Sequence, residues 1–224
     1  MMRIPRVFHR YWTGGPMPDE FVSYGQRWSA LHPDWKLYDW TDASLPNLRN
    51  ERLGADKPRL RNDNLWRVAP RLAPGRVGQL RADIVRLELL WRFGGVWLDA
   101  DMEPRKPIGE LLDDVELFAA WETDGVWINN AILGATAAHP FIDELIRRMP
   151  RSVVAHPGAQ PNVTTGPQYV TRQVRSLKPD IAIFPSAWFY PYRWDELDRA
   201  GEDFPDAYAI HRWNNRRTHA GAAS

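Results

Sequence analysis

The stretch from Leu80 to Pro104, LRADIVRLELLWRFGGVWLDADMEP, constrains the fold most, because it joins a helix, a break and a buried strand. Residues 80–93 carry apolar side chains at helical spacing with a polar opposite side, which predicts an amphipathic helix. Two glycines at 94 and 95 end this helix, since glycine readily takes the positive φ found at helix C-termini. The apolar run at 96–98 then predicts a buried strand of an α/β sheet.

Two carboxylates follow this strand in the sequence Asp99-Ala100-Asp101. Residues two apart on a strand point to one face, so both would meet at the strand's C-terminal end if the strand continues through them. Paired carboxylates repel each other unless a cation lies between them, and oxygen ligands favour Mg²⁺ or Mn²⁺. An isolated Asp-x-Asp would equally suit a solvated turn, but the buried strand before it favours the cation site.

The preceding helix carries an acid–base pair, Asp83 and Arg86, whose spacing makes them neighbours on one helix face. Such a pair can serve a site beside the two carboxylates. It can also be an ordinary surface ion pair, worth at most about 1 kcal/mol.

Composition narrows the class of protein. A chain of 224 residues suits one α/β domain, and a net charge of +1 gives no indication of binding to nucleic acid. With no cysteine, a disulfide framework is excluded and a reducing compartment fits. No apolar run reaches the roughly 20 residues of a membrane span, and the first residues lack a signal-peptide core. These features predict a cytoplasmic protein with at most peripheral membrane contact, and they leave its oligomeric state open.

Further elements follow from periodicity and turn residues. We expect one domain over residues 1–215, a basic Pro/Gly-rich excursion near the site at 48–79, and a disordered tail at 216–224. The excursion could equally be a solvated connection. The remaining strands are expected at residues 4–12, 35–40, 115–121, 125–135, 181–184 and 207–213, and the remaining helices at 18–31, 139–149 and 168–177.

The motif over residues 82–101 resembles the sugar-binding region of the DxD-containing glycosyltransferases. That family, of the family 32 type, includes yeast initiating mannosyltransferases and bacterial capsule or lipopolysaccharide sugar transferases, and clostridial glucosylating toxins have a similar core. The pattern is A-x-D-hydrophobic-x-R, a helix, then G-G-hydrophobic-aromatic-hydrophobic-D-x-D, with Trp97 in place of the usual tyrosine. The resemblance extends over residues 4–213 and implies a GT-A-type fold, a Rossmann-like, mostly parallel sheet flanked by helices.

The resemblance also implies roles for particular residues. Asp101 would be a direct metal ligand, Asp99 would contact ribose and the metal, and His211 would be a third metal contact. Asp83 and Arg86 would contact hydroxyl groups of the donor sugar. The substrate-binding residues that it implies are Ile4, Trp12, Trp97, Asn130, Gly166 and Trp213.

Some of these positions have a structural alternative. For Trp12 the alternatives are stacking on a base and packing at a strand end, and for Asn130 they are binding sugar hydroxyls and capping strand backbone. Thr165, beside Gly166, suits an N-cap of the following helix.

The predicted activity is metal-dependent transfer of a hexose from a UDP- or GDP-linked sugar to an acceptor hydroxyl, with retention of configuration. The expected cofactor is Mn²⁺ or Mg²⁺, and the expected acceptor is a carbohydrate or glycolipid of bacterial polysaccharide or glycoconjugate synthesis. Three alternatives are a toxin-like protein glycosyltransferase, a non-catalytic nucleotide-sugar-binding protein and a metal-dependent phosphoesterase.

Overall fold

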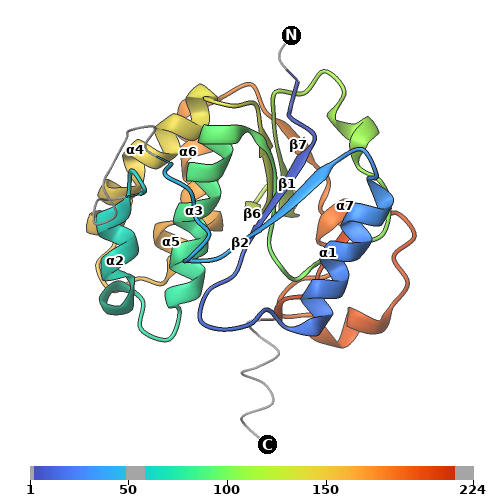
Figure 1. Cartoon of the computed structure of the whole chain (residues 1–224), viewed down its shortest axis with the longest axis horizontal. Helices are drawn as coiled ribbons and strands as arrows, with labels where there is room; N and C mark the ends of the chain where they lie inside the picture. Colours follow the sequence, from blue (N-terminus) through green and yellow to red (C-terminus); the bar gives the residue numbers. More distant parts are fainter. Residues whose placement is uncertain (1–2, 49–58, 215–224) are drawn as a thin grey trace, which may run out of the picture.

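The computed structural model describes residues 3–48 and 59–214. A central sheet separates two layers of helices (Figure 1). Helices α2 to α6 cover one face, and α1 and α7 cover the other (Figure 1). The helices of these residues are α1 (Asp19–Leu31), α2 (Asp63–Leu72), α3 (Val77–Phe93), α4 (Pro140–Ala155), α5 (Pro161–Thr164), α6 (Pro167–Leu177), α7 (Ser186–Phe189), and the 3₁₀ turns η1 (Gly109–Leu112) and η2 (Leu197–Gly201).

The main sheet has six strands in the order β2-β1-β3-β6-β5-β7. Strands β2, β1 and β3 pair in parallel, as do β5 and β7, whereas β6 runs antiparallel to both of its neighbours. A second sheet joins β4 and β8 in antiparallel fashion. The predicted mostly parallel sheet flanked by helices is therefore confirmed. The strands are β1 (Val7–Tyr11), β2 (Lys36–Trp40), β3 (Gly95–Leu98), β4 (Met102–Pro104), β5 (Leu117–Thr123), β6 (Trp127–Ala135), β7 (Ala182–Phe184) and β8 (Ala209–His211).

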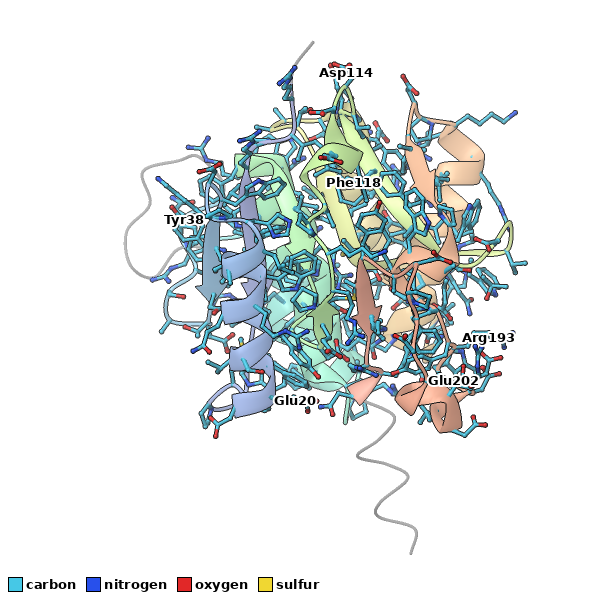
Figure 2. All side chains as sticks on the ribbon, turned by 90° about the vertical axis from the view of Figure 1, so that its right-hand side faces the viewer. Glu20, Tyr38, Asp114, Phe118, Arg193 and Glu202 are labelled. Carbon is cyan, nitrogen blue, oxygen red and sulfur yellow. The ribbon has the colours of Figure 1, made fainter. Side chains whose placement is uncertain are left out.

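Apolar cores lie on both faces of the sheet, because its central strands are buried on both sides. One core packs α3, α4 and α6 against the sheet, and the other includes Trp28 of α1 and Phe189 of α7. Phe118 of β5 lies deep in the second core, whereas Tyr38 lies on the edge strand β2 (Figure 2). All four residues of β3 are buried, as the apolar run predicts.

The glycine pair after α3 is required by close packing as well as by conformation. Gly94 and Gly95 have φ values of 65° and 98°. A Cβ on Gly95 would lie 2.6 Å from the carbonyl oxygen of Val7, and one on Gly94 would lie 2.6 Å from the Ala137 nitrogen. The predicted break is confirmed, and it lets β3 approach β1 directly.

Several expected boundaries need correction. Helix α3 begins at Val77, three residues before the predicted start, and its first turn contains Gly78. Residues 59–79 of the predicted excursion hold α2 and the start of α3, because the apolar face of α2 packs on α3. The part of the excursion at 49–58 and the predicted tail at 216–224 lie outside the described residues.

Among residues 3–48 and 59–214, no helix has both the length and the apolar character needed to cross a bilayer.

Candidate active site

A cavity of about 760 Å³ opens at the edge of the sheet where β1, β3 and β5 end and β6 begins. This is the edge at which ligands bind in open α/β sheets, because strand ends and helix starts meet there. Arg193, which also lines the cavity, lies at the same end of the molecule as Glu20 of α1 (Figure 2). Nine predicted site residues line the cavity: Trp12, Asp83, Arg86, Trp97, Asp99, Asp101, Asn130, His211 and Trp213.

The two carboxylates of the Asp-x-Asp motif converge through a turn, not through a continued strand. Strand β3 ends at Leu98, and the Met102 N–H donates to the Asp99 carbonyl at 3.0 Å, which closes the turn. Ala100, between the two acids, packs against Phe21 of α1. The condition of a continued strand is therefore not met, although both side chains reach the same site.

Arg86 lies between two carboxylates at the cavity floor. Its Nη1 donates to Asp83 Oδ1 at 2.7 Å and its Nη2 to Asp99 Oδ1 at 2.6 Å. The indole N–H of Trp97 donates to the same Asp99 oxygen at 2.7 Å. Asp83 and Arg86 are almost fully buried, so their pairing is not the surface ion pair that spacing alone would also allow.

Asp83 accepts hydrogen bonds on both oxygens. Its Oδ1 also receives the Asn130 amide at 2.9 Å, and its Oδ2 receives the Thr165 hydroxyl at 2.8 Å. Burial raises the pKa of Asp83, and the charge of Arg86 opposes that rise. Thr165 therefore binds the acid and does not cap α6, whose N-cap is Gly166. Asn130 likewise faces the site instead of capping its own strand.

The Asp101 side chain contacts His211 of β8, the last strand of the described residues. The pairing of Met102 with His211 in β4 and β8 brings His211 Nε2 to 3.2 Å from Asp101 Oδ1. The Asn214 N–H donates to the other oxygen at 2.9 Å. Burial alone would raise the pKa of Asp101, but His211 and this N–H hold it below its ordinary value. The pKa of His211 is raised, because the charge and hydrogen bond of Asp101 outweigh burial.

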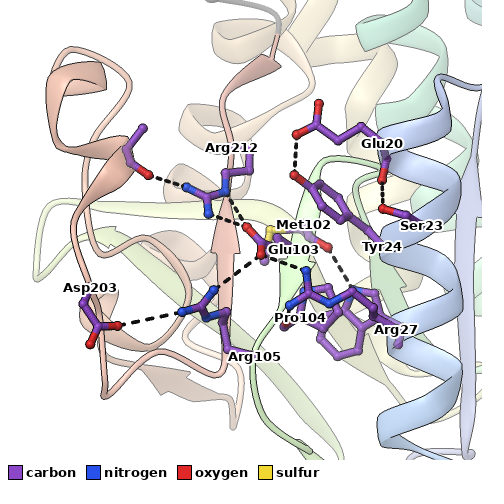
Figure 3. A network of polar contacts seen from close by, with 12 residues as sticks. Glu20, Ser23, Tyr24, Arg27, Met102, Glu103, Pro104, Arg105, Asp203 and Arg212 are labelled. Atoms are coloured by element: carbon purple, nitrogen blue, oxygen red, sulfur yellow. Dashed lines mark hydrogen bonds and ion pairs between the residues drawn. The ribbon is translucent and has the colours of Figure 1, made fainter.

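A network of ion pairs around Glu103 holds β8 in place beside the turn that carries Asp99 and Asp101 (Figure 3). Glu103 follows the motif in β4 and bonds Arg27 of α1 at 2.9 Å and Arg212, next to His211, at 2.6 Å. Arg105 approaches the same carboxylate at 3.5 Å. Burial alone would raise the pKa of Glu103, but the hydrogen bonds from Arg212 and Arg27 lower it. The position of His211 therefore depends on contacts from three separate parts of the chain.

The residues at this site suit a divalent cation. One ligand atom from each of Asp99, Asp101 and His211 lies within 4.8 Å of the others. Two oxygens and one imidazole nitrogen match Mn²⁺ or Mg²⁺ better than a thiolate-seeking metal. Within the described residues, the buried Nδ1 of His211 has no hydrogen-bond partner. Arg86 is shared by Asp83 and Asp99, so this group keeps an excess negative charge, and Asp101 lies beside it with only His211 as an ion-pair partner.

The other predicted substrate-binding residues divide into two groups. The ring of Trp12 packs edge-on against that of Phe21, with 5.7 Å between ring centroids, and it also lines the cavity. Trp12 can therefore both pack at the strand end and contact a ligand. Trp213 lines the cavity with its ring 4.2 Å from that of His211. Ile4 is buried in the core of the α1 face and Gly166 lies behind Asp83; neither lines the cavity.

Sequence reasoning missed Glu122 and Asn129, which also line the cavity. The signal for Asn129 was available, because two successive asparagines in an apolar strand break the alternation expected of a strand. The signal for Glu122 was weaker, a single acid after the apolar run of β5. Only the irregular pairing of β5 with β6 places both residues at the site.

The sheet and its two layers of helices (Figure 1) give the chain a GT-A-type fold, and the acidic turn and the buried acid–arginine pair lie at one edge of that sheet. The solved structure titled PaToxG Glycosyltransferase shares this fold, with a TM-score of 0.60 and 14% identity over 79% of this chain and 70% of that chain.

Residues 18–118 match the model of the family described as "Glycosyltransferase sugar-binding region containing DXD motif". The resemblance to this family that the motif predicted is thereby confirmed. Inositol phosphoceramide mannosyltransferase 3 of Schizosaccharomyces pombe is 28% identical over 66% of this chain and 38% of its own length. Lactosylceramide 4-alpha-galactosyltransferase of Rattus norvegicus is 29% identical over 64% of this chain and 43% of its own length. The chain thus spans roughly two fifths of the length of these curated relatives, both of which are glycosyltransferases.

Proposed function

We propose that this chain transfers a hexose from a nucleoside-diphosphate sugar to an acceptor hydroxyl, using Mn²⁺ or Mg²⁺ and retaining the anomeric configuration. The observation that carries the proposal is the convergence of Asp99, Asp101 and His211 within 4.8 Å at the cavity, beside the buried Asp83–Arg86 pair. Retention is carried over from the resemblance to the DXD transferases.

The order of strands suggests how the donor lies. The base would bind where β1 ends, near the ring of Trp12, and Arg76, which also lines the cavity, could meet the diphosphate. The sugar would then reach the floor, where Asp83 and Arg86 can contact its hydroxyl groups. Asp99 lies between these two regions and would contact the ribose.

Cleavage of the anomeric bond leaves an oxocarbenium-like sugar and negative charge on the departing diphosphate. A bound divalent ion would act as a Lewis acid toward that charge. Arg86 supplies a second, fixed positive charge, because Asp83 and Asp99 hold both ends of its guanidinium. Trp97 in turn fixes Asp99. Since these groups are already hydrogen-bonded in place, little reorganisation is needed as charge develops.

The acceptor that we propose is a carbohydrate or a glycolipid, in bacterial polysaccharide or glycoconjugate synthesis. The names of two relatives support this class, since they specify inositol phosphoceramide and lactosylceramide.

The test is nucleotide binding by calorimetry and thermal shift with UDP, GDP and their hexose conjugates, each with and without Mn²⁺. One nucleotide should bind only with Mn²⁺. At a hundredfold excess over Kd, the stabilisation should be about 2.7 kcal/mol, or a rise in Tm of roughly 5–10 °C. Asp101→Asn should abolish the Mn²⁺-dependent part while keeping the fold, because an amide oxygen can still accept the Asn214 N–H.

The matched control is Asp114→Asn, which changes a carboxylate at the opposite end of the molecule from Glu20 (Figure 2). It should bind nucleotide like the wild type. A wild type that responds to no nucleotide, or an Asp101→Asn variant with unchanged Mn²⁺ dependence, would remove the proposal.

A further inference from the structure

Glu122 is an acid in the cavity wall that the proposed donor chemistry does not use. It lies at the end of β5, where the pairing with β6 slips: Trp121 pairs with Ile128, but Thr123 pairs with Trp127. Glu122 is thus the extra residue of a β-bulge. Bulges redirect a side chain and are common beside active sites, so this one accounts for an acid of β5 facing the cavity.

The contacts of Glu122 leave one side of its carboxylate available. Its Oε2 accepts the Asn129 amide at 2.7 Å, and Asn129 is itself fixed because its Oδ1 accepts the Ala131 N–H at 2.8 Å. In the described part of the chain, no cationic side chain lies within 4.0 Å of Glu122. Glu122 is half-buried at the cavity, and the charges of His211 and Arg193 act on it from beyond that distance, so no direct ion pair occupies its second oxygen. Burial raises the pKa of Glu122 accordingly.

The position of Glu122 separates it from the nucleotide. Across the sheet the order is β1, β3, β6, β5, so Trp12 lies on one side of Asp99 and Asp101, and Glu122 lies on the other. A donor that binds its base near β1 points its sugar toward β6 and β5. The cavity wall beside Glu122 has both aromatic side chains and hydrogen-bonding groups, a combination typical of sugar-binding sites. It includes Trp127, which pairs with Thr123, and Arg193, whose charge acts on Glu122. Gln168 and Trp194 also line the cavity.

We propose that Glu122 is the anchor of the acceptor subsite, where its carboxylate accepts a hydrogen bond from a hydroxyl of a neutral, ring-shaped polyol such as a hexose or an inositol. The bulge aims the carboxylate into the cavity, and Asn129 holds its orientation. This inference rests on the proposed function, because it places the acceptor on the side of the site that the donor leaves open.

The test uses Glu122→Gln, which keeps the shape of the side chain and an oxygen for the Asn129 amide but removes the charge. Binding of lactose, myo-inositol and octyl β-D-glucoside is measured on the enzyme loaded with nucleotide and Mn²⁺. Loss of a hydrogen bond to a charged group should weaken binding of the probe, and raise its KM as acceptor, by about tenfold to a hundredfold. The nucleotide Kd should change by less than about twofold.

The matched control is Asp124→Asn, two residues further along the same hairpin, where the carboxylate bonds Ser186 and does not line the cavity. This control should bind every probe like the wild type. Equal probe affinity in Glu122→Gln and wild type would overturn the assignment, as would a wild type that binds none of the three probes. A weaker nucleotide Kd in Glu122→Gln would place Glu122 in the donor site instead. Loss of nucleotide binding in the wild type itself would refute the proposed function separately.

Discussion

Asp83 offers the sharpest test of how the site is built, because its carboxylate has a structural and a chemical task at once. Three donors converge on it: Arg86, Asn130 and Thr165. Replacing it with alanine leaves the amide and the hydroxyl without this acceptor and leaves Arg86 paired with Asp99 alone. Removing one partner of a buried ion pair costs about 3–5 kcal/mol.

Asp83→Asn should cost much less, about 1–2 kcal/mol. Its amide oxygen can still accept from Arg86 and Asn130. Its amide nitrogen can donate to the Thr165 hydroxyl, which can turn to the Pro161 carbonyl that already lies 3.2 Å away. Both variants remove the negative charge beside the donor sugar, so both should lose activity toward the sugar conjugate more than affinity for the free nucleotide.

The measurement is urea unfolding of wild type, Asp83→Asn and Asp83→Ala at neutral pH, followed by circular dichroism. We expect the alanine variant to be less stable than the asparagine variant by about 2–3 kcal/mol, the difference between the two costs. Equal stability of the two variants would refute the reasoning, since it would mean that Asp99 alone satisfies Arg86 and that the other two donors find new partners. Equal losses of affinity for nucleotide and nucleotide sugar would contradict the role in sugar binding.

Two further predictions concern His9 of β1 and Gly95 of β3, in the strands that support the site. His9 accepts the Trp40 indole N–H on Nδ1 at 3.1 Å and bonds the Gly94 carbonyl through Nε2 at 3.1 Å, and burial lowers its pKa to about 4. As pH falls, His9 is therefore protonated in the unfolded chain before it is protonated in the folded one. The free energy of unfolding should fall by about 3 kcal/mol as pH drops from about 6.5 to 4. A His9→Gln variant with the same pH slope as wild type in urea unfolding would contradict this. Gly95→Ala should lower stability by about 2–4 kcal/mol, because its Cβ would clash with Val7. Gly158→Ala, also at positive φ but with open space around it, should lose only about 1 kcal/mol, and equal losses would refute the clash.

Much of the fold was predictable because its signals are local. The apolar period of residues 80–93, the two glycines and the apolar run after them each restrict a few neighbouring residues, and α3 and β3 appear as expected. Boundaries were less predictable where packing overrides propensity. Helix α2 contains Pro70, and α4 continues past Pro150 to Ala155, because each helix has an apolar face to bury.

The sequence by itself determined the chemistry available at this site: two acids after a buried strand, an acid and an arginine on the preceding helix, and a histidine near the end. It could do so because each motif is a short pattern whose spacing has a direct physical meaning. Only the tertiary structure decided how these groups meet. Arg86 is shared by Asp83 and Asp99, and His211 reaches Asp101 across 110 residues through the pairing of β4 with β8. Glu122 enters the cavity through a bulge, and pairing between distant strands leaves no trace in the local pattern of either one.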